Sequence, residues 1–527
     1  MWGYVVGRDR LLRRGWLVLR SGIVTPDERT TNGAPPACLA QASDRAKLGS
    51  MIEPLRAAPF DYVDLFAGIG GFHAMLDHAG GRCVYVSEKD KAARETYLRN
   101  WVEPLPVEEP RPTVNHDITE ADPASVPNHM VLAAGFPCQP FSKSGRQRGM
   151  DEARGTLFWN IARILEEKTP RVVLLENVRN LAGPRHEFEW DVIIETLRDL
   201  GYRVSRTPTI FSPHLLPPEM GGTPQVRDRV YILGTYIGPG RVRAELRQGL
   251  EPPPTLPREV ADGWSPERWR IEGLLDDDDV IDGLERYVLD DVETMWVEAW
   301  DDFVRRMRAS TGERLPGFPL WSDDWVPEAS LNPETLAALP SWKQDFLRKN
   351  ARFYDRHRDV IEEWREAHPE VTSEFPASRR KFEWQAQGAE SLAECVIQFR
   401  PSGVRVRRAT YVPALVAINQ TSIVGSRMRR LTPDEVIRLQ GMPSSFDFGK
   451  QPDKASYKQA GNGVSVGAAW HVFRAHVLNE REAKDLPPEL VAAVAAAGEA
   501  FPTAVAELPG VAAAADELET PATFSAD

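Results

Sequence analysis

Short apolar runs alternate with amphipathic stretches between residues 60 and 240 of the chain. This alternation is typical of an α/β fold built on a parallel sheet. Apolar residues recur at helical spacing from Leu157 to Leu165 and predict a core-facing helix there. We predict strands at Tyr62–Phe66, at Cys83–Ser87, in the run that begins at Val131, and at Arg171–Val178.

The pattern changes between residues 240 and 400, where proline is frequent, acidic runs occur and strand–helix alternation is lost. Nine of the 15 Trp fall between residues 264 and 384, and so many Trp most simply form an irregular core. Farther on, Thr432, Pro433 and Glu435 predict a helix start with a capping box. We therefore divide the chain into a poorly ordered extension (1–56), an α/β domain (57–240), a separate small domain (241–428), a segment that returns to the α/β domain (429–484) and a disordered, Ala-rich tail (485–527).

Composition narrows the class of protein only modestly. With 527 residues, 42% of them hydrophobic and 27% charged, the chain is long enough for two or three globular domains. Its four Cys form no CxxC pair, so we expect no disulfide framework and no metal site, as in a protein of the reducing cytoplasm. No apolar stretch reaches membrane-spanning length. The net charge of −13 argues weakly against nucleic-acid binding, yet basic clusters at 379–381 and 405–408 provide local positive charge.

A glycine-containing turn at residues 67–71 follows the first predicted strand. Glycines there allow a tight turn and let a ligand approach the backbone closely, although a purely structural turn has the same composition. Glu88 follows the second predicted strand, at the place where nucleoside-binding folds hold a ribose hydroxyl pair. Together the turn and the acid indicate a nucleoside-type ligand.

Cys138 stands between Pro137 and Pro140, directly after an apolar run. The prolines stiffen this loop, which suits a nucleophile; the alternative is a buried thiol that packs as a small hydrophobe. Glu88, Cys138 and Glu176 each follow an apolar run, so we expect all three at the carboxyl edge of the sheet, where open α/β sheets bind ligands.

Two cations and a polar loop add to the candidate chemistry. Gln225, Arg227 and Arg229 alternate along a predicted strand and should project from one face, unless they are the solvated charges of an edge strand. Residues 143–154 form a polar, Gly-containing segment that is either a solvated loop or a lid over Cys138.

Taken together, these residues resemble those of the cytosine-5 DNA methyltransferases of the bacterial restriction–modification type. The matching stretches cover most of 60–240 and 400–470 in the family's order, whereas the region between them matches only by position. They are Asp64–Gly71, Glu88, Asp117–Thr119, Gly135–Ser142, Arg154–Phe158, Glu176–Val178, Gln225–Arg229, Arg430–Pro443 and Gln459–Val466.

The resemblance implies a Rossmann-like S-adenosylmethionine-dependent methyltransferase sheet with a target-recognition module at 241–428. It implies transfer of the methyl group of S-adenosylmethionine to carbon 5 of a flipped cytosine in a specific duplex sequence, through a covalent adduct with Cys138. Glu176 would hydrogen-bond or protonate the ring nitrogen, and Arg229, with Arg227 nearby, would stabilise the ring carbonyl oxygen and the thiolate. The implied cofactor contacts are Phe66, Gly68, Gly70, Glu88, Asp117, Ile118, Leu157 and Asn462, and the implied substrate-loop residues are Gln139, Ser142 and Arg146.

The partner implied by the resemblance is double-stranded DNA, and a cognate restriction endonuclease would act separately. We expect a monomer in the cytoplasm, associated with the nucleoid through DNA and not with a membrane. Two alternatives stay open. A tRNA cytosine-5 methyltransferase can use the same scaffold, usually with a smaller recognition module. A non-catalytic DNA-binding regulator would be expected to lose at least one of Cys138, Glu176 and Arg229.

Overall fold

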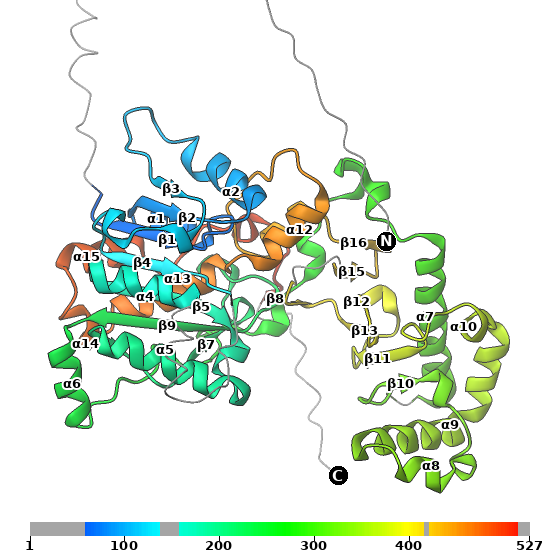
Figure 1. The fold of residues 1–527 in the computed structure, drawn as a ribbon. Helices are drawn as coiled ribbons and strands as arrows, with labels where there is room; N and C mark the ends of the chain where they lie inside the picture. Colours follow the sequence, from blue (N-terminus) through cyan, green and yellow to red (C-terminus); the bar gives the residue numbers. More distant parts are fainter. Residues whose placement is uncertain (1–57, 138–156, 313, 416–420, 515–527) are drawn as a thin grey trace, which may run out of the picture. The chain divides into compact units, whose positions relative to one another are not determined.

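The computed structural model describes residues 58–137, 157–312, 314–415 and 421–514. The predicted extension at 1–56 lies outside these residues. The described chain contains an eight-stranded sheet, a six-stranded sheet and a two-stranded pairing (Figure 1). None of the helices in this part of the chain is long and apolar enough to span a membrane.

The larger sheet has the order of a Rossmann-like fold. Its strands are β1 (Asp61–Leu65), β2 (Arg82–Ser87), β3 (Thr113–Asn115), β4 (Val131–Ala134), β5 (Val172–Val178), β6 (Tyr202–Val204), β7 (Thr209–Phe211) and β9 (Arg229–Tyr236). They are ordered β3-β2-β1-β4-β5-β9-β6, with β7 also paired to β9. Strands β1 to β5 are parallel, and β9 runs antiparallel to β5. Because the strand order reverses between β1 and β4, the carboxyl edge beside them is the expected place for a ligand.

Helices cover both faces of this sheet, which explains why its central strands are continuous apolar runs. On one face, α1 (Gly71–His78) and α13 (Val466–Val477) share a core with Leu174 of β5. On the other face, α4 (Leu157–Lys168) and α5 (Glu187–Asp199) share a core with the neighbouring Leu175. The strands and the helix predicted from the sequence are therefore confirmed, and the segment after residue 429 does return to this domain through α13.

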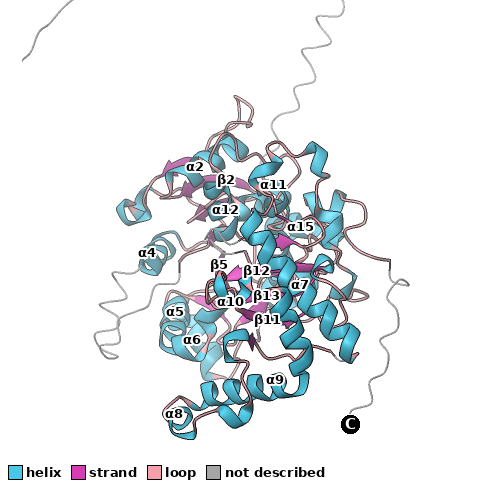
Figure 2. Ribbon diagram, turned by 90° about the vertical axis from the view of Figure 1, so that its right-hand side faces the viewer, coloured by secondary structure: helices cyan, strands magenta, loops and turns pink. Residues whose placement is uncertain are grey.

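The smaller sheet is two-faced. Its strands are β10 (Leu320–Trp321), β11 (Lys381–Gln385), β12 (Cys395–Arg400), β13 (Gly403–Arg408), β15 (Ile423–Val424) and β16 (Arg429–Arg430). One face packs on α7 (Asp291–Thr311) and α9 (Ser341–Ala367), as Figures 1 and 2 show. Trp300 and Trp364 are fully buried in this layer, and the ring of Trp300 stacks on Phe382 at 4.5 Å. The interpretation of the Trp-rich region as a core is confirmed for these residues.

The remaining elements connect and flank the two sheets. They are α2 (Lys91–Tyr97), β8 (Gln225–Val226), α6 (Pro239–Arg247), α8 (Pro333–Ala337), α10 (Glu370–Ser373), β14 (Val412–Pro413), α11 (Pro433–Arg438), α12 (Asp453–Asn462), α14 (Glu480–Ala483) and α15 (Pro488–Ala497). The capping box predicted at the start of α11 is present: Thr432 accepts from the Glu435 amide, and Glu435 accepts from the Thr432 amide. Glu435 also pairs with Arg429 at 2.8 Å, and neither side chain is exposed.

The prediction of a disordered tail at 485–527 is wrong as far as residue 514. Residues 488–497 form α15, and Leu490, Val494 and Val505 are fully buried in the core that contains α1 and α13. The backbone then pairs with a segment that the sequence assigned to the small domain, where the Arg270 amide donates to the Val511 carbonyl. The Ala-rich composition suggested disorder, but its few large apolar residues recur at spacings that bury them together. Residues 515–527 lie outside the described part of the chain.

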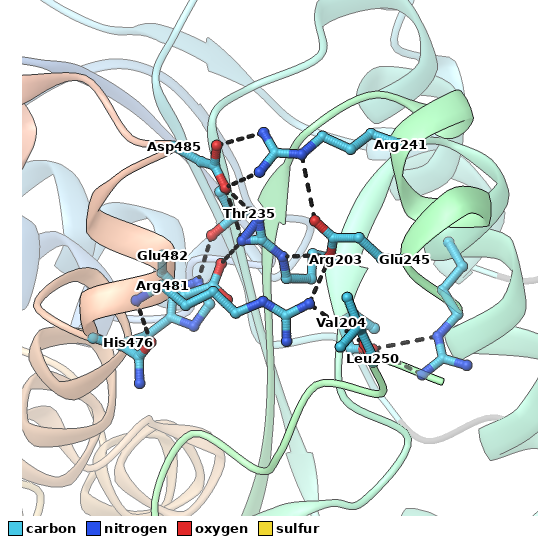
Figure 3. A network of polar contacts seen from close by, with 12 residues as sticks. Arg203, Val204, Thr235, Arg241, Glu245, Leu250, His476, Arg481, Glu482 and Asp485 are labelled. Atoms are coloured by element: carbon cyan, nitrogen blue, oxygen red, sulfur yellow. Dashed lines mark hydrogen bonds and ion pairs between the residues drawn. The ribbon is translucent and has the colours of Figure 1, made fainter. Parts of the chain in front are cut away.

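A buried ionic network fastens this C-terminal segment to the edge of the larger sheet (Figure 3). Arg203 of β6 is 2% exposed and contacts Glu245 of α6 at 3.1 Å, together with Glu482 and Asp485. Arg241 also contacts Asp485, at 2.5 Å. Because a buried arginine is tolerated only when its donors are paired, these carboxylates hold residues 482–485 at this edge.

The packed tail predicts a large loss of stability for Leu490→Ala. The side chain is fully buried, so its removal leaves a cavity and should cost about 2–5 kcal/mol of unfolding free energy. Urea unfolding followed by Trp fluorescence measures this. Leu250→Ala is the matched control, because Leu250 is 48% exposed and its truncation should cost about 0.5 kcal/mol or less. Equal, small losses for both variants would show that the tail does not pack on the core.

Candidate active site

A cavity of about 600 Å³ opens at the carboxyl ends of β1, β2, β4 and β5. This is the edge at which the sequence placed the candidate residues. The sequence-predicted residues that line it are Phe66, Gly68, Glu88, Asp117, Ile118, Leu157, Glu176, Arg227, Arg229 and Asn462. The ends of several strands and of α12 have thus brought together side chains that are hundreds of residues apart in the chain.

The glycine turn after β1 is held by Glu88. The Gly68 amide donates to Glu88 Oε2 at 2.8 Å, and the Asp90 amide donates to Oε1 at 2.7 Å. Phe66 and Gly68 both have a φ of 56°, a conformation that is costly for a side chain such as Phe and therefore characteristic of functional turns. Burial raises the pKa of Glu88, while the two amide donors oppose that shift. The turn and the acid form one rigid, partly desolvated unit.

Gly70 has a different place from the one predicted, because it is not among the residues that line the cavity. Its φ is 92°, and a Cβ there would lie 2.1 Å from Nε1 of Trp101. Trp101 donates from that nitrogen to the Ile69 carbonyl at 2.8 Å and stacks on His73. Gly70 therefore admits Trp101, which supports the turn from behind. Sequence reasoning missed Trp101, and no local signal in the sequence marks it.

Asp117 and Ile118 also line the cavity. Ile118 is buried, and Asp117 pairs with Lys89 at 2.6 Å. Hydrogen bonds from Lys89 and Thr119 lower the pKa of Asp117 to about 2. The carboxylate is therefore ionised at neutral pH and oriented beside the end of β2.

Glu176 and Arg229 form a buried ion pair at the centre of the edge. Glu176 lies near the end of β5, and Arg229 Nε approaches its Oε1 at 2.9 Å. The two side chains are 10% and 13% exposed. Burial raises the pKa of Glu176, whereas the positive charges of Arg229 and Arg227 pull it down. Burial and the two neighbouring cations therefore act in opposite directions on the pKa of this carboxyl group, and burial has the larger effect.

Asn177 holds the segment that follows β4 beside this pair. It is 3% exposed and donates from Nδ2 to the Phe136 carbonyl at 2.8 Å. Phe136 and Pro137 follow β4 and line the same cavity. The sequence placed Asn177 in a matching motif but gave it no role.

The expectation that Gln225, Arg227 and Arg229 project from one strand face is wrong. Strand β8 ends at Val226 and β9 begins at Arg229, so the alternation is interrupted between them. Gln225 is buried outside the cavity, where its Nε2 donates to the Leu439 carbonyl. The structure has two separate strands joined by a short connection where the sequence predicted one continuous strand.

The side chain of Arg227 is hydrogen-bonded to backbone carbonyls. Its guanidinium donates to Leu415 at 3.0 Å, to Gly461 at 2.9 Å and to Gly463 at 2.7 Å. Burial lowers the pKa of Arg227 to about 9. These contacts hold the segment around Asn462 against the cavity, so Arg227 acts on the site by positioning that segment.

Four predicted residues lie outside the described part of the chain. They are Cys138, Gln139, Ser142 and Arg146, together with the rest of the predicted lid at 143–154. The described chain leads up to them at Pro137, which lines the cavity that contains Glu176 and Arg229.

Comparisons with known proteins agree on one family. The family model for the C-5 cytosine-specific DNA methylase matches residues 60–477. The type II methyltransferase M.AluI of Cellulosimicrobium cellulans is 44% identical over 504 residues, which cover 82% of this chain and 94% of the relative. M.BanI of Aneurinibacillus aneurinilyticus is 30% identical over 435 residues, which cover 77% of this chain and 92% of the relative. M.HhaI of Haemophilus parahaemolyticus is 41% identical over 172 residues, or 33% of this chain and 48% of the relative.

The position of Arg227 predicts a loss of stability on substitution. Arg227→Met leaves three buried carbonyls without their donor and should lower the unfolding free energy by at least about 2 kcal/mol. Arg179→Met is the control, because Arg179 is 61% exposed and its pair with Asp228 should contribute about 1 kcal/mol or less. Urea unfolding measures both. Full stability of Arg227→Met with a loss of turnover alone would instead indicate direct contact with the reacting base.

Proposed function

This chain belongs to the C-5 cytosine-specific DNA methylase family, and we propose that it transfers a methyl group from S-adenosylmethionine to carbon 5 of a flipped cytosine in a specific duplex DNA sequence. The observation that carries the proposal is the buried Glu176–Arg229 pair, which shares one cavity with the Glu88–Gly68 turn. The part around the Glu88–Gly68 turn can bind a nucleoside. The part around Glu176 and Arg229 can stabilise the charge that develops on a heterocyclic ring during a reaction.

The cavity has the chemistry that S-adenosylmethionine requires. Phe66, Ile118 and Leu157 provide apolar surface for an adenine ring, and Glu88 provides acceptors for the ribose hydroxyls. Asp117 and Asn462 are further predicted contacts that line the cavity. When bound there, S-adenosylmethionine supplies an electrophilic methyl group on a sulfonium sulfur.

The protein's own residues activate the base. Carbon 5 of cytosine is a weak nucleophile, and addition of the Cys138 thiolate to carbon 6 makes the ring an enamine that is nucleophilic at carbon 5. Glu176 hydrogen-bonds or protonates the ring nitrogen and so neutralises the electron density that the addition creates. Arg229 stabilises the ring carbonyl oxygen. A raised pKa suits Glu176 to this role, because its carboxyl group then holds a proton more readily.

The substrate is proposed to be duplex DNA with the target base extruded. Carbons 5 and 6 are inaccessible in a stacked duplex, so the base must leave the stack, which costs a few kcal/mol. Contacts from the small domain and from residues 143–154 would offset this cost. We propose a monomer that acts on DNA in the cytoplasm, beside a separate endonuclease where the host has one.

The tRNA alternative is disfavoured by the small domain and by the relatives, whose names are those of type II methyltransferases. Competition between duplex DNA and tRNA for the purified protein distinguishes the two substrates. The regulator alternative is disfavoured because Cys138, Glu176 and Arg229 are all present.

The covalent step predicts that Cys138→Ser abolishes methyl transfer while duplex binding survives. A serine hydroxyl is far less nucleophilic than a thiolate at neutral pH, whereas the DNA-binding surface is unchanged. A tritiated-methyl assay measures transfer, and a gel-shift assay measures binding. Turnover comparable with that of the wild type would overturn the assignment of Cys138.

Substitutions of Glu176 and Glu88, two of the carboxylates that line the cavity, should have different kinetic effects. Glu176→Gln should lower kcat about 100-fold or more with little change in the KM for S-adenosylmethionine, because general acid catalysis contributes about that much. Glu88→Ala should do the reverse and raise that KM, since Glu88 faces the nucleoside part of the cavity. If Glu176→Gln changed only the KM for S-adenosylmethionine, its proposed role would be wrong.

A further inference from the structure

Asp228 lies directly before Arg229, in the connection between β8 and β9. Its carboxylate is 16% exposed and contacts two arginines. Arg179 donates to Asp228 Oδ2 at 2.8 Å, and Arg258 donates to Oδ1 from Nε at 3.2 Å and from Nη2 at 2.9 Å. We call these three residues the Asp228 clamp. None of them is among the described residues that line the cavity, so any effect of the clamp on the cavity passes through other residues.

The clamp begins where the pairing of β5 with β9 ends. Val178 of β5 is the register partner of Arg229, the first residue of β9. Arg179 follows Val178 and Asp228 precedes Arg229, so the ion pair lies one position beyond the last pair of the ladder. Opposite charges across antiparallel strands stabilise their pairing. This ion pair therefore closes the end of the ladder that carries Glu176 and Arg229.

Arg258 reaches Asp228 from a proline-rich segment. Four of the six residues from 252 to 257 are proline, which fixes φ and stiffens the chain. The Thr255 amide donates to Thr209 Oγ1 of β7 at 2.9 Å, and β7 pairs with β9. The segment thus holds Arg258 beside the start of β9, and the clamp joins this end of β9 to two strands that pair with it.

The guanidinium group of Arg229 is anchored at two of its nitrogens. Nη1 donates to the backbone carbonyl of Asp228 at 3.0 Å, and Nε lies 2.9 Å from Glu176 Oε1. Two anchors fix the plane of a planar group. Within the described part of the chain, Nη2 has no hydrogen-bond partner, so this nitrogen can donate to a substrate. The orientation of the group therefore depends on where the Asp228 carbonyl points.

A second contact holds the connection from its other side. The Arg227 amide donates to Ser212 Oγ at 2.9 Å, and Ser212 Oγ lies 2.8 Å from His214 Nδ1. Burial lowers the pKa of His214 to about 4, so its ring is neutral and Nδ1 can accept the hydrogen of the Ser212 hydroxyl. The connection is thus held at the Arg227 amide and at the Asp228 carboxylate.

We propose that Asp228 is a positioning residue for methyl transfer, because its clamped side chain fixes the carbonyl that orients Arg229. This rests on the proposed function, in which Arg229 stabilises the carbonyl oxygen of the flipped cytosine. Ion pairs of exposed arginines contribute little to stability, and Arg179 and Arg258 are 61% and 42% exposed. Stability alone is therefore a weak reason for two arginines to converge on this carboxylate, whereas a fixed donor beside a reacting ring directly lowers the barrier.

The test compares the first turnover of Asp228→Asn with that of the wild type. Unmethylated genomic DNA is the probe, because it contains short sequences of every kind, and the enzyme and S-adenosylmethionine are saturating. Asparagine keeps the size of the side chain but loses its charge, which loosens the clamp. The rate of methyl transfer should fall about ten-fold or more. The KM for S-adenosylmethionine should stay within about two-fold, because the nucleoside part of the cavity is unchanged.

A second comparison determines whether the three residues act as one unit. The double variant Arg179→Met/Arg258→Met removes both donors and should slow the first turnover as much as Asp228→Asn does. Adding Asp228→Asn to the double variant should then change the rate by less than about two-fold, because the effects of residues that share one contact do not add.

Glu245→Gln is the matched control. Glu245 on α6 is also 16% exposed and also pairs with arginines, at 3.1 Å with Arg203 and at 2.7 Å with Arg481. It belongs to the network at the β6 edge of the sheet (Figure 3) and is not among the described residues that line the cavity. This variant should keep the wild-type rate. Thermal unfolding of every variant checks that the fold is retained at the assay temperature.

Three outcomes overturn the proposal. One is a first turnover of Asp228→Asn as fast as that of the wild type. Another is equal slowing in Asp228→Asn and Glu245→Gln, which indicates a general loss of structure. The third is a full additional loss when Asp228→Asn is added to the double variant. A wild-type protein that transfers no methyl group to the same DNA would instead overturn the proposed function itself, so the failures are distinguishable.

Discussion

The candidate active site depends on the guanidinium group of Arg227. This side chain is buried and bonds to carbonyls at Leu415, Gly461 and Gly463, which lie 188 to 236 residues away along the chain. A buried charge is stable only where acceptors replace water, so the three segments must stay in place together. That requirement sets the end of α12, at Asn462, beside the strand that carries Arg229. The cavity is built from distant parts of the sequence for this reason.

Within the cavity, the rigid glycine turn and the ion pair lie at the ends of different strands. The turn at Gly68 is fixed by Glu88 on one side and supported by Trp101 on the other. The pair of Glu176 and Arg229 lies at the neighbouring strand ends, where burial and a cation act in opposite directions on the carboxyl pKa. Parallel strands present their carboxyl ends at one edge of the sheet. Residues that bind a ligand and residues that carry the chemistry can therefore lie side by side without being the same residues.

In the small domain, side chains alternate between an apolar face and a polar face of the sheet. One face of its sheet buries aromatic side chains under α7 and α9, and the other carries arginines held by acceptors of the same sheet. The aromatic layer makes the sheet rigid, which fixes the positions of the polar side chains. An acidic protein can in this way present a local basic surface, so its net charge says little about its partners.

The sequence by itself determined the α/β class, the main strands, the capping box at Thr432 and most of the residues around the cavity. These follow from local pattern, because apolar periodicity and turn residues act over a few neighbours. Only the tertiary structure decided that Arg227 positions the end of α12, that Gly70 makes room for Trp101 and that the Ala-rich tail is packed through Leu490 and Val505. The partners in these contacts are far apart in sequence or carry no local signal. Burial and hydrogen-bond pairing between distant segments are properties of the folded chain, and no local pattern in the sequence reveals them.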